Sequence, residues 1–197
     1  MDIFDKLFGS SGKVKLLRLF LLNPNQLLDR ADIIKKARIS SSTATTELGL
    51  LSRIGMLKKK SFFKETKSGK KKRVKGFMLN PHFPHNTALR NLLVVSAQDE
   101  SNVVKRISRH GKIKLIITSG IFMQEESSRL DLLVVGDNLK EGPLKTSIGA
   151  LESEIGKTIK YAIFTTQDFK YRLGICDRLV RDVFDYPHQV VVDKLGV

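Results

Sequence analysis

The residues with the clearest chemical potential are the basic ones between Lys58 and Lys75. Ten of these eighteen positions are Lys or Arg, one is the acid Glu65, and the run also contains Phe62 and Phe63. Such a run is most often a solvated face. Here it predicts two extended segments, 57–66 and 70–79, joined by the turn residues Lys67-Ser68-Gly69.

Three consecutive lysines in one predicted strand would then face four basic residues in the other, and like charges repel across a ladder. We therefore expect a polyanion outside the protein to offset this repulsion, and a phosphate backbone is the natural candidate. The residues expected to contact it are Lys58, Lys59, Lys60, Lys70, Lys71, Lys72 and Arg73.

A second candidate surface consists of short hydroxyl side chains at the start of a predicted helix. These residues are Ser41, Ser42, Thr43, Thr45 and Thr46. Hydroxyls contact phosphates more often than they read base edges. Sequence specificity would then come from the shape of the DNA, with cations of the hairpin in a narrow minor groove.

Other reactive residue types give weak signals. His82 and His85 flank Pro84 without a nearby cysteine or acidic cluster, so we expect no zinc site there. Ser119 has no accompanying His–acid pair that would make it a nucleophile. The single cysteine, Cys176, lies in an apolar helical context and is expected to be a buried core thiol. No metal or cofactor is expected.

Charge is divided unevenly along the 197 residues. Residues 1–80 contain 19 basic and 6 acidic residues, whereas residues 81–197 contain 16 and 14. This division predicts two domains and a polyanionic partner for the first one. The apolar stretches are too short to span a bilayer, and the single cysteine suits a reducing compartment, so we expect a cytoplasmic protein with no membrane contact.

Hydrophobic periodicity predicts three helices before the hairpin. Ile3, Leu7, Val14, Leu17 and Leu21 recur at helical spacing, with a break at residues 9–12. Asp29 is expected to cap a short second helix that ends near Arg38. Ser40 is expected to cap a third helix, which Gly55 ends and which turns one apolar face inward, namely Ala44, Leu48, Leu51 and Ile54.

The remainder of the chain predicts a small α/β layer. Residues 81–98, which begin with a proline-rich segment, are expected to form a linker and connecting helix between a first domain of residues 1–80 and a second of residues 99–197. Strands are expected at 113–118, 130–135, 158–165 and 189–192, and helices at 87–96, 101–109, 143–155, 167–175 and 178–185. The expected fold class is therefore α+β with two domains.

Three segments of the first half resemble a known family. They are FGSSGKVKLLRLFLLNP, RADIIKKARISSSTATTELGLLSRIGMLKK and FMLNPHFP, and together they resemble prokaryotic winged helix-turn-helix regulators of the ArsR-like type over about residues 4–90. The resemblance implies a DNA-binding domain in which residues 41–46 and the basic hairpin face the duplex.

The second half is similar to another family. The segments LIITSGIFMQEESSRLDLLVVGDNL, IGALESEIGKTIKYAIFTTQDFKYRL and YPHQVVVDKLG are similar to minimal nucleotidyltransferase domains of the polymerase-β-like superfamily. In active members a Gly-Ser turn holds a triphosphate, and an Asp-x-Asp pair with a third carboxylate binds two Mg²⁺ ions. Here the turn reads Ser119-Gly120, the pair reads Arg129-Leu130-Asp131, and the third position falls at Lys160. The resemblance therefore implies a catalytically degenerate domain without magnesium.

Three alternatives stand for this degenerate site. Asp131 is expected to form an ion pair with Arg129 or Lys160, as a carboxylate beside cations usually does. Arg129 and Lys160 could instead hold a small anionic ligand. In the third alternative, Glu125 and Glu126 replace the missing acids from a loop.

The function predicted from these patterns is that of a transcriptional regulator that binds double-stranded DNA and is not an enzyme. Its second domain would serve dimerisation, sensing or the binding of a protein partner, and a homodimer is expected because one winged helix reads only a short half-site. Two alternatives remain: an active nucleotidyltransferase that modifies a protein or RNA, and a non-specific architectural DNA-binding protein.

Overall fold

Two units make up the structure, a computed structural model that describes residues 3–65, 69–95, 100–125 and 127–197. The first comprises Met1–Ala97 with Glu152–Lys157, and the second comprises Gln98–Leu151 with Thr158–Val197. Each unit has its own sheet, so the fold is mixed α and β. None of the helices in the described ranges is long and apolar enough to cross a membrane.

The first unit begins with four helices, and side-chain caps fix the starts of three of them. The helices are α1 (Ile3–Phe8), α2 (Ser11–Leu22), α3 (Arg30–Ala37) and α4 (Ser41–Arg53). The Asp29 carboxylate accepts a 2.8 Å hydrogen bond from the backbone N–H of Asp32, and the Ser40 hydroxyl accepts one of 3.0 Å from the N–H of Thr43. Both predicted caps are confirmed.

These helices bury an apolar core that contains Leu16, Phe20, Ile33, Ala44, Leu48 and Leu51. The expectation that Ile54 continues the inward face of α4 is wrong, because Ile54 is the C-terminal cap and is 53% exposed. On α1 it is Phe4 and Phe8 that pack against the core, whereas Ile3 and Leu7 are exposed. The helical periodicity of the sequence therefore predicted the wrong side of this short helix as the buried side.

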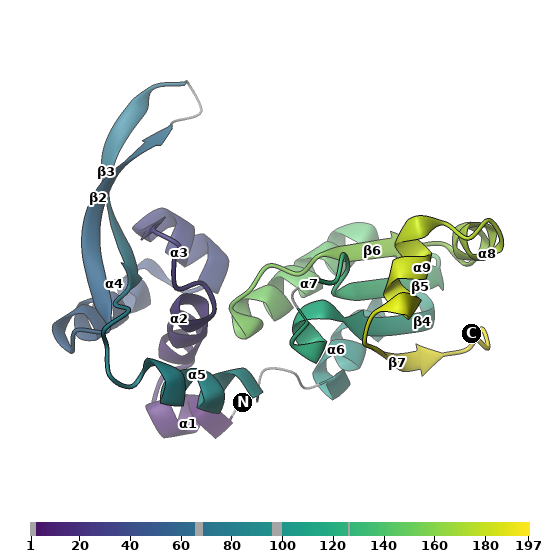
Figure 1. The fold of residues 1–197 in the computed structure, drawn as a ribbon, viewed down its shortest axis with the longest axis horizontal. Coiled ribbons are helices and arrows are strands. Elements are labelled where there is room, and N and C mark those ends of the chain that lie inside the picture. Colours follow the sequence, from purple (N-terminus) through teal and green to yellow (C-terminus); the bar gives the residue numbers. More distant parts are fainter. Residues whose placement is uncertain (1–2, 66–68, 96–99, 126) are drawn as a thin grey trace. The chain divides into compact units, whose positions relative to one another are not determined.

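A long hairpin follows the helices (Figure 1). It consists of β2 (Leu57–Glu65) and β3 (Lys71–Leu79), and a two-residue strand, β1 (Leu28–Asp29), adds to β3 to give an antiparallel sheet of order β1-β3-β2. Because β1 pairs only with Phe77 and Gly76, the distal part of the hairpin is a two-stranded ribbon. The predicted turn at 67–69 lies largely outside the described residues.

The first unit extends beyond residue 80. Helix α5 (Asn86–Val95) belongs to it, since Leu93 is buried in the same core and its carbonyl accepts a 3.1 Å hydrogen bond from Nε of Arg18. Asn80 closes the connection before this helix, because its backbone N–H donates to the carbonyl of Met56 and its side-chain amide donates to that of Gly55. The segment expected to be a linker is therefore mostly part of a packed unit.

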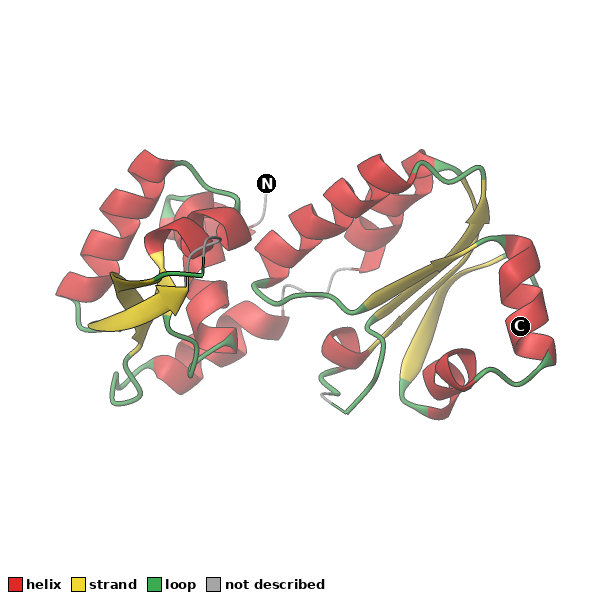
Figure 2. Cartoon of the chain, turned by 90° about the horizontal axis from the view of Figure 1, so that it is seen from above, coloured by secondary structure: helices red, strands yellow, loops and turns green. Residues whose placement is uncertain are grey.

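The second unit is a four-stranded sheet with helices on both faces (Figure 2). Its strand order is β6-β5-β4-β7, in which β5 and β6 are parallel and the other pairs antiparallel. In chain order the elements are α6 (Glu100–Ile107), β4 (Lys112–Ser119), β5 (Leu132–Asp137), α7 (Glu141–Ile155), β6 (Tyr161–Phe164), α8 (Thr166–Gly174), α9 (Arg178–Asp185) and β7 (His188–Asp193), with short 3₁₀ turns at Ser108–His110 and Gly120–Met123. The last residues of α7, from Glu152 on, are counted with the first unit.

One face of this sheet packs on α8 and α9. Its buried residues alternate along the central strands, as in Leu115 and Ile117 of β4, and meet Phe169 of α8 and Val180 of α9. The expectation of a buried Cys176 is wrong. Cys176 is exposed and has a left-handed φ of 52°, because it lies in the turn that follows α8.

Candidate functional site

The register of the hairpin corrects the simple view of two basic strands that repel each other. Lys58, Lys59 and Lys60 lie opposite Met78, Phe77 and Gly76, not opposite the basic residues of β3. Lys59 instead lies over the ring of Phe77, at 6.0 Å from its centroid. One directly opposed pair of cations occurs in the described ladder, Lys64 with Lys72.

Strand alternation divides the cations between two faces of the hairpin. Directly opposed residues point to the same side, and neighbours along a strand point to opposite sides. We call one side the Arg73 face; it comprises Lys59, Ser61, Phe63, Glu65, Lys71, Arg73, Lys75 and Phe77. The other side, the Lys64 face, comprises Lys58, Lys60, Phe62, Lys64, Lys72 and Val74.

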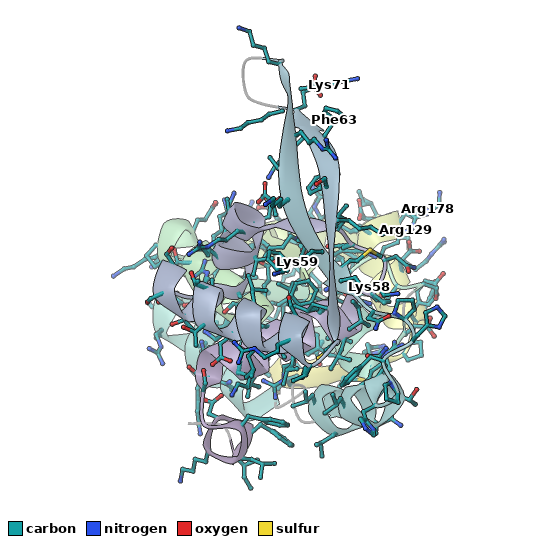
Figure 3. All side chains as sticks on the ribbon, turned by 90° about the vertical axis from the view of Figure 1, so that its left-hand side faces the viewer. Lys58, Lys59, Phe63, Lys71, Arg129 and Arg178 are labelled. Carbon is teal, nitrogen blue, oxygen red and sulfur yellow. The ribbon has the colours of Figure 1, made fainter. Side chains whose placement is uncertain are left out.

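The Arg73 face carries three evenly spaced cations on one strand. Lys71, Arg73 and Lys75 are all exposed, and within the described part of the chain none of them has an ion-pair partner. Figure 3 shows Lys71 near the distal end of the hairpin, and Lys58 and Lys59 near its base. The predicted residue Lys70 is also exposed and directly precedes β3. This row of cations is suited to a line of phosphates.

The Lys64 face is partly neutralised and packed. The ammonium of Lys64 contacts the carboxylates of Asp29 and Asp32 at 2.7 and 2.6 Å. These contacts raise the pKa of Lys64. Burial raises the pKa of Asp29, but the hydrogen bonds from Lys64 and from the backbone of Asp32 outweigh it, so the pKa lies below its ordinary value. Lys64 thus ties the distal part of β2 to the start of α3.

Four of the five predicted hydroxyl residues are exposed on α4: Ser41, Ser42, Thr45 and Thr46. Thr43 is half-buried and turns toward α2, where a Cβ built on Gly12 would clash with its methyl group. The exposed guanidinium of Arg30 donates to the hydroxyls of Ser41 and Thr45. Arg30 therefore adds a positive charge to this surface.

Sequence reasoning missed Arg30 and the role of Lys75. Arg30 follows the predicted cap Asp29, but its partners are 11 and 15 residues away on the next helix. Lys75 belongs to the basic run and could have been found by counting alternate positions from Arg73 along the predicted strand.

In the second unit, the buried carboxylate of Asp131 connects two backbone segments by hydrogen bonds. It is 2% exposed. One carboxylate oxygen accepts from the N–H of Ile121 at 2.9 Å, and the other accepts from the N–H of Lys160 at 2.7 Å. Gly120 lies against this carboxylate with a φ of +54°, and a Cβ built there would overlap the carboxylate oxygen Oδ1. The position therefore requires glycine.

The expected ion pair of Asp131 with a neighbouring cation is wrong. The side chain of Arg129 contacts Asp182 of α9 at 2.8 Å, and the ammonium of Lys160 donates to the backbone carbonyl of Ser128. The structure does bring Lys160 to Asp131, but through its backbone N–H. Ser119 is buried, and its hydroxyl contacts Ser128 and the carbonyl of Pro187.

The loop acid Glu125 is hydrogen-bonded within its own loop. Its carboxylate accepts hydrogen bonds from the hydroxyl and the N–H of Ser127, which hold its pKa below the ordinary value. Glu126 lies outside the described residues. Within the described ranges no group of three or more His, Cys, Asp or Glu side chains is placed to hold a metal ion.

Comparison with known proteins gives no match to any protein-family model or to any curated protein. The function is therefore inferred from the two sites themselves.

Proposed function

We propose that residues 1–80 form a winged helix-turn-helix that binds double-stranded DNA and that the chain is a cytoplasmic transcriptional regulator. The observation that carries this proposal is the row of exposed cations Lys71, Arg73 and Lys75 on a projecting hairpin. In the proposed arrangement α4 enters the major groove and the hairpin is the wing, which lies along the backbone of an adjacent groove.

Binding to duplex DNA should weaken steeply with salt, because each phosphate contact releases about one counterion. The test is a titration of the full-length protein with labelled duplexes of several unrelated sequences at a series of salt concentrations. A plot of the logarithm of affinity against that of salt with a slope near zero would contradict the proposal.

The same titration separates regulation from architectural binding. The exposed side of α4 carries mostly small residues, such as Ser42, Thr46 and Gly49, and one arginine, Arg53, in its last turn, so it offers few contacts to base edges. This observation favours non-specific architectural binding as the second candidate function. Affinities that differ by about 10³-fold or more between duplexes would support a regulator, and equal affinities would support the architectural protein.

For the second unit we propose a nucleotidyltransferase-like domain that does not catalyse transfer and serves dimerisation, the sensing of a small anionic ligand or the binding of a protein partner. The support is that Asp131 is used by two backbone N–H groups while Arg129 and Lys160 occupy the other positions of the implied metal site.

We expect the protein to transfer no label from ATP, CTP, GTP or UTP to protein or RNA acceptors with Mg²⁺ or Mn²⁺, because the metals would meet two cations where carboxylates are needed. Incubation with each labelled nucleotide measures this directly. Transfer that disappears in Asp131→Ala while the protein stays folded would instead establish the active enzyme.

The regulator is expected to be a homodimer, because two winged helices one helical turn apart read a longer site than one. Exposed apolar residues are available on both units, such as Leu7 of α1, Leu92 of α5 and Ile175 after α8. Light scattering at tens of micromolar protein measures the mass, and a clean monomer both with and without duplex DNA would contradict the expectation.

A further inference from the structure

The Arg73 face has one exposed apolar side chain, which phosphate binding does not use. Phe63 is 70% exposed and lies directly opposite Arg73 in the ladder, near the distal end of the hairpin (Figure 3). Lys71 and Lys75 lie on the same face, one alternate position to either side of Arg73. A single exposed apolar residue is ordinary on a protein surface, but one surrounded by these cations faces whatever the cations bind.

We propose that Phe63 is a wedge that inserts between stacked base pairs of duplex DNA from the minor groove. This inference rests on the proposed function, since it assumes that the Arg73 face contacts a duplex. Apolar side chains that enter from the minor groove partly unstack a base step, at a cost of about a few kcal/mol, which is offset because the bent duplex covers more of the protein surface. Arg73 and its two neighbouring lysines are placed to bind the phosphates of the bent duplex.

A wedge residue needs a well-anchored strand, and the two sequence neighbours of Phe63 anchor this strand on the opposite face. Its sequence neighbour Phe62 points to the opposite face and is half-buried over Gly76, where an added Cβ would lie 2.6 Å from the Phe62 ring. Its other neighbour, Lys64, is fixed by Asp29 and Asp32. Both neighbours anchor the strand on the Lys64 face, and strand alternation presents Phe63 on the other side.

The charge of the surrounding face favours a nucleic acid over an apolar protein partner. The face carries four exposed cations, namely Lys59, Lys71, Arg73 and Lys75, and one acid, Glu65, and these would lose their hydration in an apolar interface. In a complex with a duplex, the same cations would lie next to phosphates, and the Phe63 ring would move from water into the base stack. Duplex DNA is therefore the ligand that satisfies both kinds of side chain on this face.

The test is a change in DNA linking number. Nicked plasmid is ligated in the presence of saturating full-length protein and deproteinised, and its topoisomers are then separated. Wild type should shift the topoisomer distribution, because insertion at a base step unwinds the duplex. Phe63→Ala should lose most of this shift at equal DNA occupancy, and Phe63→Leu should retain it, since leucine is also an effective wedge.

The matched control is Tyr171→Ala, which removes an aromatic side chain of similar exposure, 68%, from the second unit and should leave the shift unchanged. An unchanged shift in Phe63→Ala would overturn the wedge while leaving the DNA-binding function intact. A loss of affinity confined to single-stranded DNA would also overturn it, in favour of stacking on unpaired bases. If wild type fails to bind the plasmid at all, the proposed function itself fails.

Discussion

Replacing Lys71, Arg73 and Lys75 together by alanine should weaken duplex binding by about 10²- to 10³-fold at 0.1 M salt. All three cations are exposed on one face of the hairpin, and in the proposed complex each of them contacts a phosphate. Losing three such contacts should also flatten the slope of log affinity against log salt by about 3. Fluorescence anisotropy with a labelled duplex at several salt concentrations measures both quantities.

The opposite side of the same hairpin provides the control. Substituting Lys58, Lys60 and Lys72 by alanine removes the same charge from the Lys64 face. If the Arg73 face contacts the duplex, this second variant should change the salt slope by less than about 1, because it alters only the surrounding field. Equal losses in the two variants would mean that the hairpin binds through diffuse charge and would contradict the assignment of one face.

Asp131→Ala should destabilise the second unit by about 2–4 kcal/mol, because the N–H groups of Ile121 and Lys160 lose their acceptor in a poorly hydrated site. For a unit of this size the corresponding loss in melting temperature is about 10–20 °C. A carboxylate that served only to bind catalytic metal would behave differently, since its removal would abolish activity and leave the fold intact. Thermal unfolding followed by circular dichroism measures the effect.

Three further variants sharpen this test. Gly120→Ala pushes a methyl group against the Asp131 carboxylate and should destabilise to a similar degree. Gly142→Ala adds a methyl group in open space and should have little effect. Asp193 also accepts backbone N–H bonds, but it is exposed, so water can replace it in Asp193→Ala. If Asp131→Ala has the same melting temperature as wild type, Asp131 does not stabilise the fold, and the active-enzyme alternative gains support.

The sequence was most informative where the physical signal is local. A capping side chain accepts a hydrogen bond from the backbone N–H three residues later, so Asp29 and Ser40 could be recognised as caps without knowledge of the fold. Alternating and helical periodicities likewise predicted most elements of both units. The winged-helix and nucleotidyltransferase-like interpretations of those elements stay predictions.

Predictions that depend on partners far apart in the chain were less successful. Lys64 finds Asp29 and Asp32 only because β2 folds back past α3, and Arg129 finds Asp182 only because α9 packs beside it. Asp131 is held by backbone N–H groups, which exist at nearly every position and leave no mark in the sequence. The apolar neighbours of Cys176 in the sequence favour burial, but Cys176 lies in the turn after α8 and is exposed.

Because Asp29 contacts both α3 and the hairpin, we expect these two parts of the first unit to unfold locally together. One of its oxygens caps α3 and the other holds Lys64 of the hairpin. Since its pKa is lowered in the folded state, this stabilisation is present above the ordinary carboxyl pKa and is lost as the pH falls through the folded value. Acid should therefore release the first turn of α3 and the tethered strand together, so that amide hydrogens in both segments lose their protection from exchange over the same pH range.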